Sequence, residues 1–324
     1  MTANPHGLAL DPAAQAFLVS AGSHPLTHTH AAAAAQRAAW AELQRDTHGT
    51  DAAAPISERW TTVETPDHGA LRVRIVERSD RTAPSPAVLY LHGGGWVHGD
   101  AATHDRIVRE LAIRSGAAVI FPEYALCPEA RYPVALEQVY ATAQWVITRG
   151  AEHGLDSTRL AVAGDSEGAN LAIAVILLAL QRKSFQFRQL VAFTPVTDVD
   201  FATPSYLTFA QGYGLRRDTM QWHWDQYVPN PQDRALDTVC PLRAQDRDLA
   251  RFPPSLIITA EADVVRDEGE AFSARLRAAG AVSAAVRYEG TIHDFVVLNA
   301  LRESGAAKAA TAQAAAALAA ALSW

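Results

Sequence analysis

The sequence contains 324 residues, of which 49% are hydrophobic and 19% charged, and its formal net charge is −7. This composition excludes a disordered chain, because it supplies enough apolar material for a buried core. The acidic balance argues against a nucleic-acid partner, since no excess of Lys and Arg is available to neutralise phosphates. The two cysteines, Cys127 and Cys240, have no metal-ligand or CxxC spacing and indicate free thiols in a reducing compartment.

The first 55 residues are rich in alanine, histidine and polar residues and contain no strand pattern. Residues 31–43 are mostly helix-favouring and predict a helix. The first twenty residues include Asp11 and lack a basic start followed by an apolar stretch. We therefore expect no secretory signal and a cytoplasmic protein.

Strand patterns begin at Trp60. Residues 60–65 and 71–78 alternate apolar and polar side chains on either side of a Pro-Asp-His-Gly turn, which predicts an antiparallel pair. Short apolar runs typical of fully buried strands follow at 87–91, 117–121, 160–163, 190–193, 255–259 and 284–288. Helical stretches separate most of them, at about 103–115, 133–149, 168–182 and 268–279. Alternating strands and helices predict a mostly parallel sheet.

One interval breaks this alternation, between the strands at 190–193 and 255–259. An insertion of that length after a strand is typical of a functional lid. The C-terminal run at 306–322 is mostly alanine and predicts a terminal helix packed on the body rather than a membrane span. The aromatic residues of the insertion include Tyr206, Phe209, Tyr213, Trp222 and Trp224.

The strongest local signal is the sequence Gly-Asp-Ser-Glu-Gly at 164–168. It follows a predicted strand and precedes a helical run, which is the strand–turn–helix context of a nucleophile elbow. Ser166 then lies at a helix N-terminus, where the dipole and free N–H groups favour developing negative charge. The alternative is a glycine-rich turn that merely contains a serine.

A second motif, His-Gly-Gly-Gly-Trp at 92–96, follows the predicted strand at 87–91. Glycines directly after a strand expose backbone N–H groups, which an oxyanion hole requires. Taken alone, this run could equally form a flexible loop, but the serine motif downstream favours the catalytic interpretation. The candidate donors are the N–H groups of Gly93, Gly94, Gly95 and Glu167.

A serine hydroxyl is a weak nucleophile near neutral pH, so a base and an orienting acid are needed. Asp263 follows a predicted strand closely enough to reach the crevice, whereas Asp267 and Glu268 suit the start of the next helix. His293 lies on the loop after the final predicted strand. The order Ser166, Asp263, His293 is the order that the α/β-hydrolase fold uses.

The other histidines are weaker candidates. We expect His98, His104 and His153 in surface loops, and His223 lies in the insertion as a weaker candidate base. The sequence contains no HExxH motif, no clustered set of carboxylates, no GxGxxG and no Walker-type loop, so we expect no metal site.

These motifs resemble those of the hormone-sensitive-lipase-like branch of the α/β hydrolases, which includes many bacterial carboxylesterases and acetyl hydrolases. The resemblance covers roughly residues 55–324. It rests on the motifs at 92–96 and 164–168, on the segment 122–133, and on the stretches around Asp263 and His293, in that order.

The resemblance implies an eight-stranded, mostly parallel sheet with helices on both faces, and no cofactor. It implies a single domain over residues 1–324, with a helical cap formed by about 1–55 and 198–245. Substrate-pocket candidates are Trp96, Tyr206, Phe209, Tyr213 and Trp222.

Two positions depart from the family pattern. Glu167 stands where a small residue commonly follows the serine, and Asp294 stands where glycine commonly follows the histidine. If the Glu167 carboxylate faces the site, it opposes the oxyanion and selects against anionic substrates. If it faces solvent, it is an acid at a favourable helix start. Both orientations stay open, and we favour the inward one.

We predict a serine carboxylic-ester hydrolase that forms an acyl-enzyme. Bulky rings shorten an acyl pocket, so acetyl to about hexanoyl esters are the expected substrates. The alternatives are an amide or N-acyl hydrolase (a deacetylase or formamidase) on the same triad, and a non-catalytic binding protein. The expected partner is a small-molecule ester. We expect no nucleic acid and no stable membrane insertion, and a homodimer is compatible with the sequence.

Overall fold

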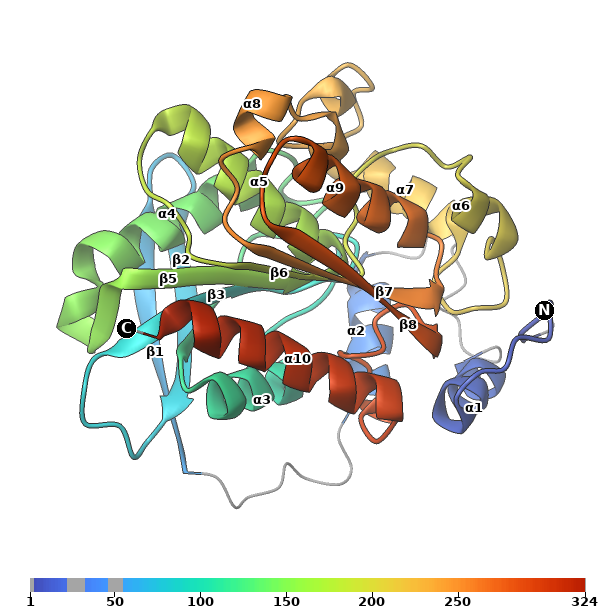
Figure 1. Ribbon diagram of the computed structural model, residues 1–324, viewed down its shortest axis with the longest axis horizontal. Helices are drawn as coiled ribbons and strands as arrows, with labels where there is room; N and C mark the ends of the chain where they lie inside the picture. The colour runs from blue at the N-terminus through green and yellow to red at the C-terminus, as the bar shows by residue number, and fades with distance from the viewer. Residues whose placement is uncertain (1–2, 22–32, 46–54, 324) are drawn as a thin grey trace.

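An eight-stranded sheet forms the centre of the protein, with the strand order β1-β2-β4-β3-β5-β6-β7-β8 (Figure 1). The computed structural model describes residues 3–21, 33–45 and 55–323. Each predicted strand is present, which confirms the predicted fold class. The strands are β1 (Ile56–Thr65), β2 (Gly69–Arg78), β3 (Ser85–Leu91), β4 (Ala118–Pro122), β5 (Leu155–Asp165), β6 (Leu190–Phe193), β7 (Ser255–Ala262) and β8 (Ser283–Ile292).

The sheet is mixed only at one edge. β1 and β2 form the predicted antiparallel hairpin, and its turn contains Asp67 and Gly69 with φ of 63° and 72°. β2 also pairs antiparallel with β4, and all later pairs are parallel. Every residue of β3 is buried, because helices cover both faces of the sheet, and this explains its continuous apolar run.

Helices cover the two faces of the sheet (Figure 1). One face carries α3 (Asp105–Ser115) and α10 (Gly305–Leu322). The other carries α4 (Val134–Arg149), α5 (Ser166–Arg182) and α9 (Arg266–Ala278). The four predicted internal helices are therefore confirmed, with ends shifted by one or two residues. Two short 3₁₀ turns complete this part, η1 (Gly150–His153) and η4 (Asn299–Leu301).

The C-terminal helix α10 packs against α3, as predicted. It begins after Ser304, whose hydroxyl accepts a hydrogen bond from the N–H of Ala307 and so caps the helix. Ala310, Ala314 and Leu318 on its inner face are buried. Within the described ranges, no helix combines the length and the apolar character that a membrane crossing requires.

The insertion between β6 and β7 folds into short helices rather than a structureless loop. They are α6 (Pro204–Thr208), α7 (Arg217–Tyr227), η2 (Asp233–Ala235), η3 (Pro241–Arg243) and α8 (Asp246–Leu249). Figure 1 shows α6 and α7 at the end of the sheet to which the β7 and β8 arrows point. The carboxyl ends of parallel strands form the ligand-binding edge of such sheets.

The N-terminal helices α1 (Pro12–Ala21) and α2 (Ala33–Leu43) lie at the same end (Figure 1). The first two residues of the predicted 31–43 helix lie outside the described residues. The N–H of Asn4 donates to the Gly212 carbonyl at 3.0 Å. The Arg37 side chain donates to the carbonyls of Val97 and Cys127 at 2.8 and 2.9 Å. The N-terminal region therefore contacts both the insertion and the segment after β3.

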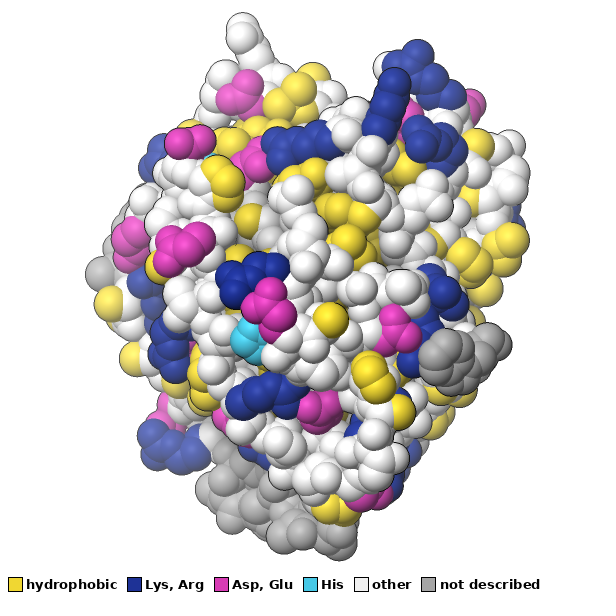
Figure 2. Space-filling view, turned by 90° about the vertical axis from the view of Figure 1, so that its left-hand side faces the viewer, with side chains coloured by type: hydrophobic (Ala, Val, Ile, Leu, Met, Phe, Trp, Pro, Cys, Tyr) yellow, Lys and Arg dark blue, Asp and Glu magenta, His cyan; other side chains and the backbone are white. Residues whose placement is uncertain are grey.

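The opposite end of the molecule, where α10 stops, faces the viewer in Figure 2. Acidic and basic side chains are interspersed there with apolar ones. A hollow of about 500 Å³ is lined by residues that precede β6 and β7, including Phe187 and Phe252. Since it lies at the starts of these strands, it is remote from the serine motif at the end of β5.

Candidate active site

Ser166 lies on a sharp turn between β5 and α5. Its φ is +52°, in the left-handed region, which is the strained backbone expected of a nucleophile elbow. A Cβ on Gly168 would lie 2.2 Å from the Leu91 carbonyl oxygen. A Cβ on Gly164 would lie 2.6 Å from the carbonyl oxygen of Gly168. Only glycine permits this close approach of β5, α5 and β3, which accounts for both glycines of the motif.

The structure brings Ser166, His293 and Asp263 together from the ends of β5, β8 and β7. Ser166 Oγ lies 2.9 Å from His293 Nε2, and His293 Nδ1 lies 2.7 Å from Asp263 Oδ2. All three side chains are buried. The other oxygen of Asp263 accepts a hydrogen bond from the N–H of Val265 at 3.1 Å, which fixes the carboxylate.

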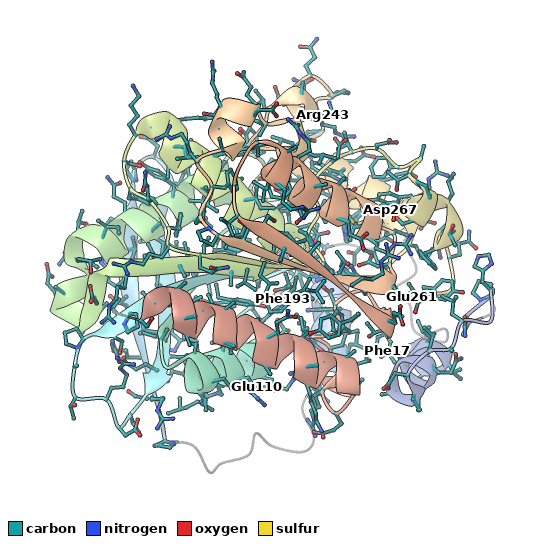
Figure 3. The ribbon with its side chains drawn as sticks, viewed as in Figure 1. Phe17, Glu110, Phe193, Arg243, Glu261 and Asp267 are labelled. Carbon is teal, nitrogen blue, oxygen red and sulfur yellow. The ribbon has the colours of Figure 1, made fainter. Side chains whose placement is uncertain are left out.

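The neighbouring acids have other partners. Asp267, at the start of α9 (Figure 3), accepts a hydrogen bond from the N–H of Ser205 at 2.8 Å and pairs with Arg266. Glu268 accepts from the N–H of Thr197 at 2.7 Å, and burial raises its pKa well above the usual value. These contacts connect α9 to the insertion and leave Asp263 as the acid that faces the histidine.

The glycine run after β3 presents only two of its three amides to the serine. The N–H groups of Gly94 and Gly95 donate, at 3.3 and 2.7 Å, to the Glu167 oxygen that also accepts from Ser166 Oγ. The N–H of Gly93 instead donates to Asp165 Oδ2 at 2.9 Å. The expectation that Gly93 is an oxyanion-hole donor is therefore wrong, because Asp165 already uses this amide.

Asp165 holds the glycine run after β3 in place through hydrogen bonds. Besides the Gly93 amide, its carboxylate accepts a hydrogen bond from the Tyr90 hydroxyl at 2.7 Å and lies 3.4 Å from His104 Nε2. Although burial opposes it, the Asp165 charge raises the pKa of His104 above the usual value. Asp165 was not among the predicted site residues, although an acid directly before the serine of a tight turn was a usable signal.

Two histidines expected in surface loops are buried instead. His104 and His98 are 1% and 8% exposed. The segment after β3 packs against α2, and the ring centroids of His98 and Trp40 are 5.0 Å apart. Burial and the nearby His223 lower the pKa of His98 to about 3, so its ring is neutral. The third, His153, is half-buried at the end of η1.

The side chain of Glu167 faces inward. Besides the two amides, its Oε2 accepts a hydrogen bond from Ser166 Oγ at 2.8 Å. Its Oε1 lies 3.5 Å from His223 Nδ1, and both side chains are buried. Burial acts to raise the pKa of Glu167, but His223, His293 and the Gly95 amide together lower it well below the usual range. The group is therefore a carboxylate.

Three carboxylates surround His293. In addition to Asp263 and Glu167, Asp294 places Oδ1 3.3 Å from His293 Nε2. Burial opposes the charged imidazole, but these anions raise the pKa of His293 to about 10. Burial and the neighbouring anions raise the pKa of Asp294 to about 7. Asp294 has φ of +58°, in the left-handed region that glycine adopts more readily than other residues.

The five pocket candidates occupy different surroundings. Trp96 stacks on Tyr227 with ring centroids 4.1 Å apart. The Tyr213 hydroxyl donates to Asn4 at 3.1 Å and so faces the N-terminal segment. The remaining three are Tyr206, which is fully buried, Phe209, whose ring meets that of Tyr213, and Trp222, whose ring lies 5.5 Å from that of His223.

Known proteins share both fold and sequence with this chain. Residues 88–297 match a family described as having the alpha/beta hydrolase fold. An esterase from Gibberella moniliformis is 40% identical over 228 residues, which are 70% of this chain and 72% of that protein. An ethyl acetate hydrolase from Pseudomonas putida is 34% identical over 245 residues, 75% of this chain and 76% of its own. The crystal structure of a thermostable esterase from Pseudomonas putida matches 98% of both chains with a TM-score of 0.92 and 38% identity.

The chain therefore belongs to the α/β-hydrolase family, in the hormone-sensitive-lipase-like branch that its motifs resemble. Within that family it is a serine hydrolase of the carboxylesterase type.

Proposed function

We propose that Ser166 is the nucleophile, His293 the general base and Asp263 the residue that orients the imidazole and stabilises its charged form. The observation that carries this proposal is the unbroken chain of contacts from Asp263 through His293 to Ser166 at a strained turn. The N–H groups of Gly94, Gly95 and Glu167 are the proposed oxyanion-hole donors. The last of these is in the first turn of α5, where an amide has no partner within the helix.

The proposed reaction has two halves. His293 Nε2 takes the hydroxyl proton of Ser166 as Oγ attacks the ester carbonyl carbon, and the carbonyl oxygen becomes an oxyanion. The tetrahedral intermediate collapses, the C–O bond to the alcohol breaks, and His293 gives its proton to the departing alcohol. Water then attacks the acyl-enzyme with His293 as base, which releases the acid and restores Ser166.

Short-chain acyl esters, from acetyl to about hexanoyl, are the proposed substrates, because the insertion contributes bulky rings such as Trp222, which lies beside His223. A relative described as an ethyl acetate hydrolase supports this choice. The relatives reported above are esterases, so they favour ester over amide hydrolysis.

The nucleophile is tested by labelling with an organophosphate and by turnover of p-nitrophenyl esters and anilides graded by acyl length. Ser166→Ala should abolish labelling and lower ester turnover by about 10⁴-fold or more. The control is Ser79→Ala, at an exposed position after β2, which should keep both. Labelling that persists in Ser166→Ala would refute the assignment. Efficient hydrolysis of emulsified long-chain triglyceride, with little activity on acetyl esters, would refute the substrate class.

We also propose that about 1–55 and 198–245 form a cap over the site within one domain spanning 1–324. The hydrogen bond between Asn4 and Gly212 and the contact of the His6 N–H with the Tyr213 hydroxyl support it, since both connect the two parts. Asn4→Ala with Tyr213→Phe removes side-chain contacts between them. The double variant should broaden acyl-length preference, and an unchanged preference would count against the cap.

A cytoplasmic location is proposed from the two cysteines, both of which are buried free thiols. Fractionation of cells that express the full chain tests it. The homodimer stays a prediction, and light scattering of the purified protein measures it directly.

A further inference from the structure

The proposed oxyanion hole already contains an anion. Glu167 Oε2 accepts hydrogen bonds from the N–H groups of Gly95 and Gly94 and from Ser166 Oγ, at 2.7, 3.3 and 2.8 Å. A substrate carbonyl oxygen needs the same two amides and must lie next to the same hydroxyl. The carboxylate of Glu167 and an ester carbonyl therefore compete for one position.

His223 offers the displaced carboxylate a second position. Its Nδ1 lies 3.5 Å from Glu167 Oε1, beyond ordinary hydrogen-bond distance, and has no hydrogen-bond partner among the described residues. The ring is 5% exposed. It packs against Gly95, since a Cβ there would lie 2.3 Å from its Nε2. A buried nitrogen that lies beside the hole without a hydrogen bond is a ready partner for a carboxylate that moves away from Gly95.

We propose that Glu167 is a specificity-determining residue that occupies the oxyanion hole of the free enzyme, and that His223 receives its carboxylate when an ester carbonyl enters. The inference rests on the proposed function of Ser166. A short side-chain movement exchanges the contacts with Gly95 and Ser166 for one with His223. The carboxylate stays within the site in both positions, so it repels any anion near the reacting carbon.

The charge arrangement in the free enzyme agrees with this. The Ser166 hydroxyl has one proton and donates to only one acceptor at a time. When it donates to Glu167, a protonated His293 donates to Oγ, and this proton passes to solvent when the ester displaces Glu167, so that His293 is neutral when it acts as the base. The raised pKa of His293 favours its protonated form in the free enzyme. The other titratable groups that interact with Glu167 are Asp294, His98, Tyr206 and Tyr124, and the His98 ring also lies 5.9 Å from that of His223.

Two consequences distinguish this site from one with a small residue after the serine. An ester that carries a second carboxylate is a poor substrate, since its charge lies close to Glu167. The product acid is a weak inhibitor, because its carboxylate must enter a hole beside another carboxylate. Glu167 therefore favours neutral esters and promotes release of the acid.

The test uses butyrate as inhibitor, and p-nitrophenyl butyrate and p-nitrophenyl hemisuccinate as neutral and anionic substrates. Glu167→Ala should tighten the inhibition constant of butyrate and raise the hemisuccinate-to-butyrate ratio of kcat/KM, each by about ten-fold or more. Glu167→Gln removes the charge but keeps the size, so it should change the substrate ratio more than the inhibition constant. The control is Glu137→Ala, which removes an acid from the first turn of α4 and should change neither.

The role of His223 is tested in two backgrounds with His223→Phe, which keeps a ring but has no hydrogen-bond donor. In the parent protein it should raise KM for p-nitrophenyl butyrate several-fold with little change in kcat, because the displaced carboxylate loses its partner. In Glu167→Ala the same substitution should change KM less than about two-fold. A purely structural role of His223 would give equal effects in both backgrounds and would overturn this part of the proposal.

The outcomes separate the inference from the proposed function. An unlabelled, inactive parent protein would refute the role of Ser166. A parent protein that is labelled and active, with Glu167→Ala labelled to the same extent but unchanged in butyrate inhibition and in substrate ratio, would refute the inference alone.

Discussion

Replacing Asp165 by asparagine tests how the loop after β3 is held. Three donors converge on this buried carboxylate: the Gly93 N–H at 2.9 Å, the Tyr90 hydroxyl at 2.7 Å and His104 Nε2 at 3.4 Å. Asparagine has nearly the same shape but only one acceptor oxygen. Its amide nitrogen is a donor and must face at least one of the three donors.

The magnitude follows from these contacts. A hydrogen bond to a charged group contributes about 1.5–3 kcal/mol. Asp165→Asn keeps only one of the two acceptor oxygens. The loss of one or two hydrogen bonds to the charged group should therefore lower the free energy of unfolding by about 2–5 kcal/mol. Once Gly93 is released, the amides of Gly94 and Gly95 shift, and a displacement of about 1 Å can cost roughly 100-fold in rate.

Urea denaturation and the kcat/KM for p-nitrophenyl butyrate measure the two effects. Asp267→Asn is the matched control, because it weakens the contacts with the Ser205 N–H and with Arg266, both away from the glycine run. It should lower the free energy of unfolding by about 1–3 kcal/mol and leave kcat/KM within a few-fold. If Asp165→Asn instead unfolds within about 1 kcal/mol of the parent protein and keeps its kcat/KM, the anchoring role is refuted.

Three further predictions concern the surrounding charges. Asp263→Asn should lower kcat by about 10³–10⁴-fold and Asp267→Asn by less than ten-fold, and equal losses on p-nitrophenyl butyrate would contradict the choice of acid. Asp294→Asn removes an anion 3.3 Å from His293 Nε2, so the pKa of His293 falls and the acidic limb of the kcat/KM profile moves down by about one pH unit. The difference between the parent protein and Asp294→Asn should be clearest above pH 7, where Asp294 is ionised. An acidic limb at the same pH in both proteins would contradict an effect of Asp294 on the pKa of His293. The pKa of His104 is raised on folding, so its stabilising effect is complete below about pH 6.5 and is lost as pH rises through the folded-state value. The stability advantage of the parent protein over His104→Gln should therefore shrink between pH 6 and pH 9 in urea denaturation, and a constant difference would contradict this.

The strands of the sheet could be predicted because each one is recognisable from its own short stretch of sequence. Buried parallel strands require continuous apolar runs, and each such run became a strand. The ends of the strands were predicted less accurately. β5 begins at Leu155 rather than at residue 160, because the polar residues 156–159 also belong to the strand. The short helices of the insertion were not predicted, because a helix such as α6 depends on packing more than on its own sequence.

The proximity of Asp263, His293 and Ser166 could be inferred because each follows a strand end, and the carboxyl ends of parallel strands lie at one edge of the sheet. Contacts between distant segments could not. Nothing in the sequence places His223 beside Glu167, because the path of the insertion decides it. His104 looked like a loop residue, yet the Asp165 charge in the interior holds it there. The Gly93 amide was misassigned because three adjacent glycines carry no information on which N–H points where.

The late position of His293 in the chain decides when the enzyme gains activity during synthesis. The proposed base, His293, lies 127 positions after Ser166, on the loop that follows the last strand, and α10, which packs against α3, comes after it in the chain. With His293 as the proposed base, a nascent chain that contains only β1 to β7 carries the serine turn without its base. We expect such a chain, and any fragment that ends before β8, to lack esterase activity.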